Sequence, residues 1–161
     1  MALRAAPILA EALKHSPYNR DNQRYKAIIY QIMGKKDKAI NVYRHLISRS
    51  KKSNEFQELA NLIEDERYKI ALLCKAITLQ RDEKFRQRLR FTLAELLFRQ
   101  DKARARYELD KCLEARRQAG YTITWAMQNL TASLSEVNPV SDAAEKAFYR
   151  EQEIVVKELI L

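Results

Sequence analysis

The chain has 161 residues, of which 47% are hydrophobic and 32% are charged, and its formal net charge is +9. This length fits one domain with its own core, and the composition excludes an intrinsically disordered chain. With only two glycines and three prolines, the sequence argues against a sandwich or barrel with many hairpins and favours helices with short connections.

Membrane and secretory proteins are also disfavoured. The sequence has no apolar run of the roughly 18 residues that a membrane span needs. Glu11 interrupts the apolar N-terminal stretch, and no small-residue cleavage site follows, so we expect no signal peptide. Cys74 and Cys112 are too few for a disulfide scaffold and lack zinc-ligand spacing. We interpret them as small apolar filler in a reducing cytoplasm.

The first predicted element, residues 1–19, is one helix that is closed by Pro17. Its apolar stripe includes Leu9, which stands 34 positions before Tyr43 of the following unit. We expect Pro7 in the first turn of this helix, where the missing N–H of proline is harmless. The element is therefore interpreted as the second helix of a unit that lacks its first.

Residues 20–53 form two short amphipathic segments on either side of Gly34. Apolar residues recur at helical spacing, with Tyr25, Ile28, Ile29 and Ile32 before the glycine and Ala39, Ile40, Tyr43, Leu46 and Ile47 after it. Helices this short are marginal in isolation, so each needs a partner. Gly34 suits the left-handed conformation that ends a helix. The segment therefore predicts an antiparallel helix pair.

Small and aromatic residues in this pair follow a known spacing. The 34-residue tetratricopeptide pattern places small residues where helix backbones approach and aromatic residues between layers, with a glycine at the turn. Those residue types stand in register at Ala27, Tyr30, Gly34, Ala39 and Tyr43. The chain therefore resembles the tetratricopeptide repeat family. The resemblance implies an all-α, right-handed solenoid of antiparallel helix pairs, with about seven or eight helices.

The pattern recurs more loosely in residues 54–82 and 83–120, where Ala60 and Ala94 are again 34 positions apart. In each unit the second helix carries a cysteine on its apolar stripe, which supports the filler interpretation. We expect Gly120 to end the last of these helices, just as Gly34 ends the first helix of residues 20–53.

Residues 121–161 follow the pattern least, and Asp142 with Glu145 has the spacing of an N-terminal capping box. We interpret the whole chain as a single tetratricopeptide-like domain, with units at roughly residues 1–19 (partial), 20–53, 54–82, 83–120 and 121–161 (divergent). Solenoid ends normally carry polar caps, and these do not. We hypothesise that the chain is a piece of a larger protein, or that its terminal helices pack on each other or on a second copy in a homodimer.

No motif for catalysis, metal binding or cofactor binding is found. His15 and His45 stand alone, whereas a structural zinc site needs about four converging ligands. The lysines after Gly34 lack the preceding glycine and strand of a phosphate loop. The acidic residues 64–66 are consecutive, so on a helix they diverge and are poor acid–base partners. We expect no enzyme activity, no metal and no cofactor.

Two classes of function remain open. The resemblance implies a protein–protein interaction scaffold that holds a peptide or protein in a concave groove made mainly by the first helices. The alternative is a nucleic-acid-binding accessory module, because residues 1–50 contain ten Lys/Arg against three Asp/Glu and residues 84–91 read KFRQRLRF. This charge comes without an aromatic platform or a nucleic-acid motif, so we prefer the scaffold.

The repeat register also predicts the groove residues. On the inner side of the first helices it places Arg24, Ile28, Gln31, Gln57, Asn61, Arg88, Phe91 and Glu95. We expect both arginines to be exposed and to favour an acidic segment, because Arg pairs bidentately with carboxylates. In the other reading, Ile28 and Phe91 are core residues and the arginines are merely solvated. The family's groove for a terminal carboxylate is not predicted, because only Arg24 and Arg88 match its charges.

Overall fold

The computed structural model describes residues 2–17 and 19–160, with residues 2–6 described as backbone only. In this part of the chain there are nine α-helices and no strand. They are α1 (Ala2–His15), α2 (Arg20–Ile32), α3 (Lys36–Ile47), α4 (Ser53–Leu62), α5 (Glu66–Leu79), α6 (Glu83–Leu97), α7 (Lys102–Ala119), α8 (Trp125–Ser133) and α9 (Asp142–Ile160). The predicted all-α class is confirmed, with more helices than the seven or eight expected.

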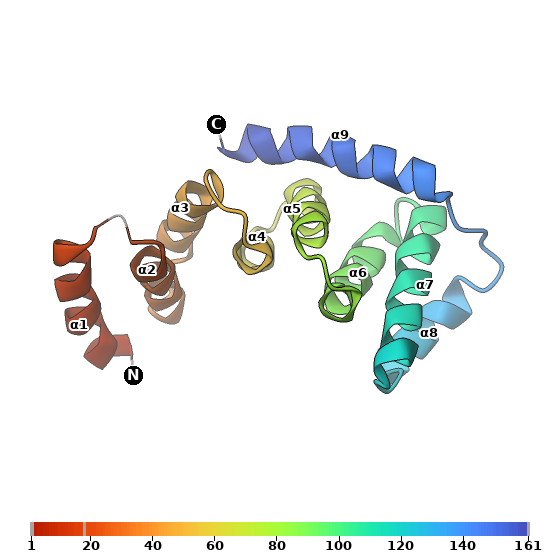
Figure 1. Cartoon of the computed structure of the whole chain (residues 1–161), viewed down its shortest axis with the longest axis horizontal. Helices are drawn as coiled ribbons and strands as arrows, with labels where there is room; N and C mark the ends of the chain where they lie inside the picture. The colour runs from red at the N-terminus through yellow and green to blue at the C-terminus, as the bar shows by residue number, and fades with distance from the viewer. Residues whose placement is uncertain (1, 18, 161) are drawn as a thin grey trace.

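The first seven helices follow one another along the long axis of the molecule (Figure 1). Each packs against the next in sequence, from α1 on α2 to α6 on α7. The connections are short, and the turn between α4 and α5 is only residues 63–65. Short connections keep sequential helices adjacent in space, so most of the packing in this row joins neighbours in the chain.

Both glycines occupy the left-handed region, at φ +73°. After Gly34, the N–H of Lys35 donates to the Tyr30 carbonyl at 2.8 Å, which closes the end of α2. The N–H that follows Gly120 makes a bond of the same length, 2.8 Å, to the last turn of α7. A side chain at this φ is strained, so glycine is the residue that permits each reversal. The predicted role of both glycines is confirmed.

Small residues at the predicted repeat positions are buried in the core. The alanines of this kind are at most 3% exposed, and they are Ala27, Ala39, Ala60, Ala94 and Ala105. Tyr43 is completely buried beside them. Cys74 and Cys112 are free thiols in the same core, and burial raises the pKa of Cys112 to about 11. These thiols are neutral and enclosed at ordinary pH, so the interpretation as apolar filler is confirmed.

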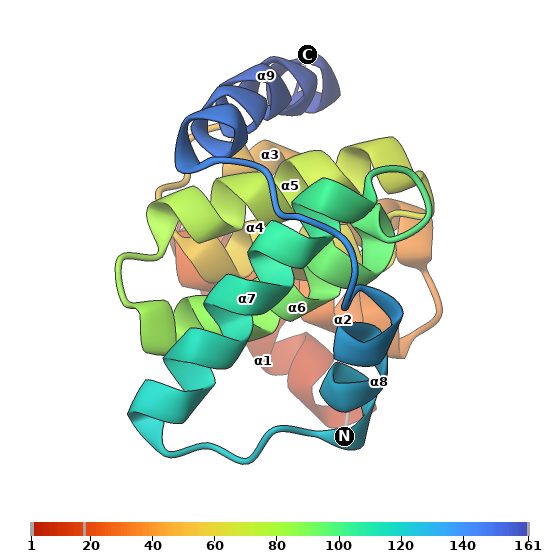
Figure 2. The ribbon, with the colours of Figure 1, turned by 90° about the vertical axis from the view of Figure 1, so that its right-hand side faces the viewer.

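The last helix does not continue the row. α9 runs back across α5 and reaches α3 (Figures 1 and 2). Its inward face buries Val156 and Leu159, and Arg44 of α3 donates to the Leu159 carbonyl at 2.8 Å. Lys75 of α5 pairs with Glu153 at 2.9 Å. The divergent last unit therefore consists of the short helix α8 and a long helix that covers one side of the row.

Two predictions about helix starts are wrong. Pro7 lies inside α1 rather than in its first turn. The cap of α9 is Ser141, whose Oγ accepts the N–H of Ala144 at 3.1 Å. Glu145 is buried and accepts a hydrogen bond from Arg104 of α7. This long-range hydrogen bond holds the Glu145 side chain away from the cap, and sequence spacing carries no sign of such a contact.

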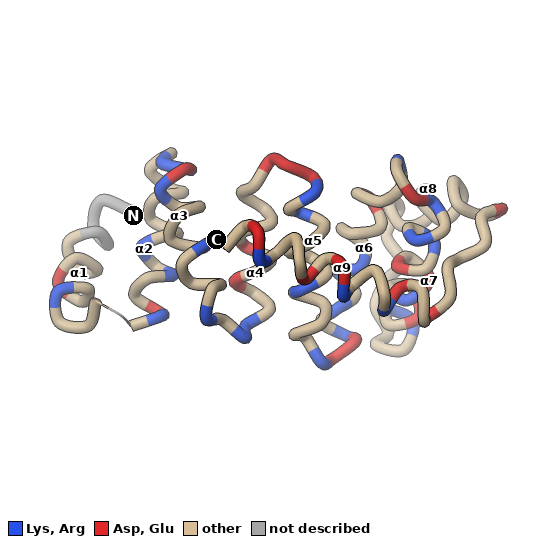
Figure 3. Tube along the Cα trace, turned by 90° about the horizontal axis from the view of Figure 1, so that it is seen from above, with Lys and Arg blue, Asp and Glu red and all other residues tan. Residues whose placement is uncertain are grey.

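Charged residues are distributed unevenly along the row (Figure 3). Lys and Arg outnumber Asp and Glu in residues 1–50 by ten to three. Toward α6, α7 and α9 the two signs are interspersed (Figure 3), and many of these residues pair with each other. The net charge of a region therefore does not show which of its cations are available to a partner.

Candidate partner-binding site

The predicted groove residues all lie on α2, α4 and α6, but one cavity gathers only three of them. Gln57, Arg88 and Phe91 line this cavity. Glu95 lines a smaller, separate hollow. The remaining four, Arg24, Ile28, Gln31 and Asn61, do not line the larger cavity.

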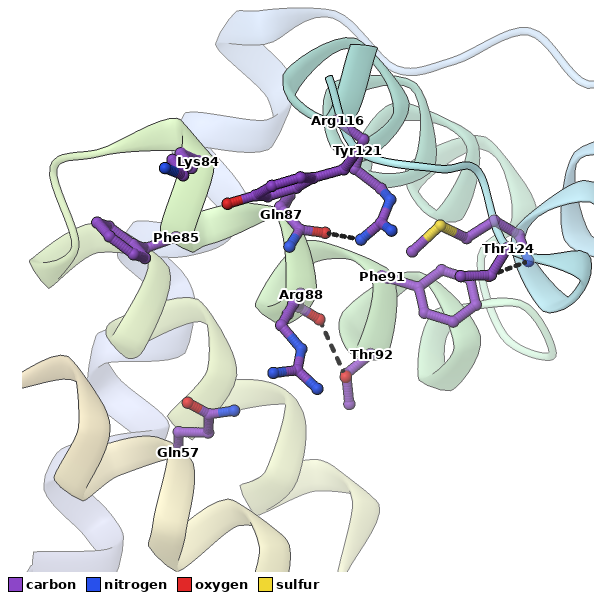
Figure 4. A pocket seen from close by; sticks show the side chains of 11 residues that line it. Gln57, Lys84, Phe85, Gln87, Arg88, Phe91, Thr92, Arg116, Tyr121 and Thr124 are labelled. Atoms are coloured by element: carbon purple, nitrogen blue, oxygen red, sulfur yellow. Dashed lines mark hydrogen bonds between the residues drawn. The ribbon is translucent and has the colours of Figure 1, made fainter. Parts of the chain in front are cut away.

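The larger cavity has a volume of about 800 Å³, within the range of typical ligand sites. We name it the α6–α8 pocket. Its walls come from α4, α6, the end of α7 and the segment that leads into α8 (Figure 4). The lining residues are Gln57, Lys84, Phe85, Gln87, Arg88, Phe91, Thr92, Arg116, Tyr121, Thr124 and Met127.

One face of α6 supplies most of the wall. The helix begins after Asp82, whose carboxylate accepts the N–H of Lys84 at 2.9 Å. Lys84, Arg88 and Phe91 are then four and three positions apart, so their side chains project from the same face. The KFRQRLRF run thus places two cations and a ring on one surface.

The facing wall follows the turn at Gly120. The chain leaves α7 there and places Tyr121 over the pocket, above Arg88 in the view of Figure 4. Thr124 caps α8 by accepting the N–H of Met127 at 3.2 Å. The cap fixes the start of α8, and Met127, which is buried, then closes the inner end of the wall.

The pocket is positively charged. Lys84, Arg88 and Arg116 line it, and no Asp or Glu does. In the described part of the chain, none of the three forms a salt bridge. Arg116 donates to the Gln87 amide oxygen at 2.8 Å and to the Thr122 carbonyl at 2.9 Å, and both acceptors are neutral. No carboxylate of the described residues therefore neutralises the positive charge of this pocket.

Aromatic rings stand beside these cations. Phe85 is 59% exposed and Tyr121 is 39% exposed. The Lys84 ammonium lies 5.9 Å from the Phe85 ring centroid and 5.7 Å from that of Tyr121. Phe91 is half-buried and packs on the core while also lining the pocket. Exposed rings next to cations form a surface for an anionic ligand with planar or apolar groups.

The Arg24 guanidinium pairs with a carboxylate of the same chain. Its Nε donates to both carboxylate oxygens of Glu58 at 3.1 Å, and the Tyr43 hydroxyl donates to the same carboxylate at 2.8 Å. The hydrogen bond to Glu58 raises the pKa of Arg24, against a smaller effect of burial. The expectation that Arg24 is exposed and open to a partner is therefore wrong, because Glu58 lies opposite it on α4.

The other predicted residues are less distinctive. Ile28 and Gln31 are half-buried on α2, and Asn61 is exposed on α4. Glu95 is exposed, and partial burial raises the pKa of its carboxyl. The alternative prediction, that Phe91 is a core residue, is correct in part, because its ring packs on the core and also lines the pocket.

Sequence reasoning missed Lys84, Phe85, Arg116, Tyr121 and Met127 as parts of the site. The first two belong to the KFRQRLRF run, which was recognised only as basic. The other three come from the end of α7 and from the chain after Gly120. No spacing in the sequence shows that this segment folds back toward α6.

A buried ionic network occupies the opposite face of α6. Arg90 donates to Glu108 of α7 at 2.8 Å and to Glu83 at 3.2 Å. The hydroxyl of Tyr149 on α9 also donates to Glu108. Arg90 is 6% exposed and Glu108 is fully buried, so this pair has little contact with water. The network joins α6, α7 and α9.

A second buried carboxyl, Glu145 of α9, lies in the same network. Arg104 donates to its Oε2 at 2.8 Å, and the guanidinium lies 4.1 Å from the Phe148 ring centroid. Glu145 Oε1 is buried and accepts no hydrogen bond from the described residues. Burial and the neighbouring Glu108 carboxylate raise the pKa of Glu145 far above its usual range. A protonated Glu145 can donate to Glu108, which satisfies both oxygens.

The part of the chain that the structure describes contains neither a metal-binding cluster nor a membrane-spanning helix. Residues 7–17 and 19–160 contain no group of three or more His, Cys, Asp or Glu side chains arranged to hold a metal ion. No helix among the described residues is long and apolar enough to cross a membrane.

Comparison with known proteins gives a family assignment. No curated protein shows significant similarity to the chain. A family profile described as a domain of unknown function (DUF7017) matches residues 23–154, which includes all of α3 to α8 and most of α2 and α9. Because the match covers well over half of the sequence, the chain belongs to the DUF7017 family.

Proposed function

We propose that this domain is a non-catalytic protein-interaction scaffold of tetratricopeptide type, a right-handed solenoid that binds an acidic segment of a protein partner. Sequential packing from α1 to α7 and buried alanines at the repeat spacing support this architecture. The free, buried cysteines support a reducing cytoplasmic location.

The α6–α8 pocket is the observation that carries the proposal. Three cations without a carboxylate partner surround a cavity of about 800 Å³ on the α4 and α6 side of the row. Cations without a carboxylate partner favour anionic ligands, and a guanidinium such as that of Arg88 can hold a carboxylate through two parallel hydrogen bonds. An acidic segment therefore complements this surface in both charge and geometry.

The polar lining suits an extended peptide. Gln57 offers an amide group, and Thr92 and Thr124 offer hydroxyl groups, around the same cavity. Such groups can bond the N–H and C=O groups of a peptide backbone independently of its side chains. Cations then select the acidic side chains, and the amide and hydroxyls hold the main chain.

A charge-reversal experiment tests the pocket. The variant carries Lys84→Glu with Arg88→Glu, and the probe is a fluorescein-labelled peptide rich in Asp, Glu and Phe at about 150 mM salt. Both side chains are exposed and outside any salt bridge, so the fold should be retained. We expect the affinity measured by fluorescence polarisation to fall more than tenfold, about 1.4 kcal/mol.

A matched control separates local from general charge. Lys51→Glu with Lys52→Glu makes the same change in net charge at exposed positions between α3 and α4. This control should bind the peptide as the unmodified chain does. Equal losses in both variants, or no binding by the unmodified chain, would contradict the proposal.

Single-stranded nucleic acid is the second candidate, and one observation favours it. The exposed Phe85 and Tyr121 rings beside Lys84 resemble the stacking surfaces that such proteins use. We expect a uridine oligonucleotide to bind weakly at low salt and negligibly at physiological salt, because phosphate contacts are salt-dependent. Sub-micromolar binding at physiological salt would reverse the ranking of the two candidates.

A further inference from the structure

The α6–α8 pocket has an apolar inner wall and a charged rim. Phe91 and Met127 both line the cavity, where Phe91 is half-buried and Met127 is 4% exposed. Lys84, Arg88 and Arg116 lie around them (Figure 4). A ligand that only carries charge would use the rim and leave the inner wall in contact with water. The two parts together therefore describe a more specific ligand than an acidic chain.

The inner wall suits an aromatic side chain. A methionine sulfur makes a favourable contact with an aromatic ring, and Met127 lines the same cavity as Phe91. Tyr121 also lines the cavity and is 39% exposed, so its ring can stack on an inserted one (Figure 4). A cavity of about 800 Å³ has room for one large side chain together with the adjoining backbone.

The rim suits acidic residues on both sides of that ring. Lys84 lies beside Phe85, and both Lys84 and Arg116 lie by the Tyr121 ring, at 5.7 and 5.6 Å from its centroid (Figure 4). Arg88 lies between them and points toward Gln57 (Figure 4). Three cations around one cavity complement carboxylates before and after the inserted side chain.

We propose that the α6–α8 pocket selects an acidic protein segment with an aromatic anchor, in which one Phe, Tyr or Trp enters between Phe91, Met127 and Tyr121 while flanking Asp or Glu residues pair with the rim cations. This inference rests on the proposed function and adds the identity of the central side chain. It makes Tyr121 a specificity residue for the anchor and Arg88 a residue for the flanking charge.

Three labelled peptides of equal length test the proposal. The first has a central Phe between runs of Asp and Glu, the second has Ala in place of Phe, and the third has Asn and Gln in place of the acids. Fluorescence polarisation should show that the second peptide binds more than tenfold more weakly than the first. The third should not bind measurably, because the rim cations would stay unpaired.

Two protein variants locate the effect. Tyr121→Ala should weaken the Phe peptide severalfold and leave the weaker Ala peptide unchanged. Tyr25→Ala removes another exposed tyrosine, on α2, and should change neither. Near-ultraviolet and far-ultraviolet circular dichroism would check that both variants remain folded.

The outcomes separate the two proposals. Equal binding of the Phe and Ala peptides would overturn the aromatic anchor and leave the acidic-segment scaffold standing. Absence of binding by all three peptides would overturn both. Tight binding of the uncharged Phe peptide would overturn the role of the rim cations. If an oligonucleotide displaces the labelled Phe peptide and an unlabelled acidic peptide does not, the pocket would be assigned to nucleic acid.

Discussion

Arg88 and Arg90 are two residues apart on α6 and lie in opposite environments. Arg88 is exposed and lines the α6–α8 pocket without a carboxylate partner among the described residues. Arg90 is buried and pairs with Glu83 and Glu108. A helix turns by about 100° per residue, so this spacing directs the two side chains away from each other. The comparison shows that the structural role of an arginine depends on what faces it.

The same contrast separates the two ends of the predicted groove. On α2, Arg24 is neutralised by Glu58, whereas Lys84 and Arg88 on α6 have no carboxylate partner among the described residues. Some cations of the predicted groove are therefore paired within the chain and others are unpaired, although the sequence pattern is similar along the whole groove. The following predictions test this difference, from the largest expected effect to the smallest.

The largest effect should come from the buried arginine. Arg90→Ala leaves the Glu108 carboxylate buried without its cation, and such losses typically cost about 3–5 kcal/mol of unfolding free energy. Arg88→Ala should change that free energy by less than about 0.5 kcal/mol. Urea unfolding followed by circular dichroism measures both. Similar stability of the two variants would show that the two faces of α6 do not differ as described.

The second effect is a pH dependence that arises from Glu145. Its pKa is raised in the folded chain by burial and by Glu108, with Arg104 acting in the opposite direction, while 4.5 is the ordinary value. From pH 4.5 up to the folded-state pKa, the folded chain binds more protons than the unfolded chain, so stability falls as pH rises. The slope has an upper limit of about 1.4 kcal/mol per pH unit for one proton.

Glu145→Gln sharpens that measurement. The amide imitates the protonated carboxyl, because it can accept from Arg104 and donate to Glu108 without titrating. Its urea stability should therefore decline less with pH than that of the unmodified chain. Glu153→Gln, which alters a partly exposed pair with Lys75 on the same helix, is the control and should keep the original slope. Identical slopes for all three chains would rule out a shared proton at Glu145.

The smallest effect concerns Glu58. Glu58→Gln weakens the ion pair with Arg24 and the hydrogen bond from Tyr43, in a site that water partly reaches. We expect a loss of about 1 kcal/mol in unfolding free energy. The same variant frees the Arg24 guanidinium, so affinity for an acidic peptide should rise slightly. A drop in that affinity would indicate that Glu58 itself takes part in binding.

Three residues of the α6–α8 pocket were predicted from the sequence. Gln57, Arg88 and Phe91 were placed on the inner side of first helices, and all three line the α6–α8 pocket. That placement needs only the repeat register, since a helix fixes which positions share a face. The same reasoning placed Arg24 in the groove. Arg24 instead pairs with Glu58 on α4, and the repeat register does not reveal that partner.

The amino-acid sequence by itself determined the helix pairs. Apolar residues at helical spacing, alanines 34 positions apart and a left-handed glycine at Gly34 and Gly120 act through local geometry, so a reader of the sequence can find them. These features set where helices begin to reverse and which faces are buried. They account for the row from α1 to α7.

Only the tertiary structure decided the path of α9 and the charge state of each surface. Arg44 meets the Leu159 carbonyl, and Glu108 meets Tyr149, across long stretches of chain. Such contacts depend on how helices pack and not on spacing within any one helix, so no periodicity encodes them. The cavity between α6 and α8 has the same origin, because its two walls come together only when the chain after Gly120 folds back.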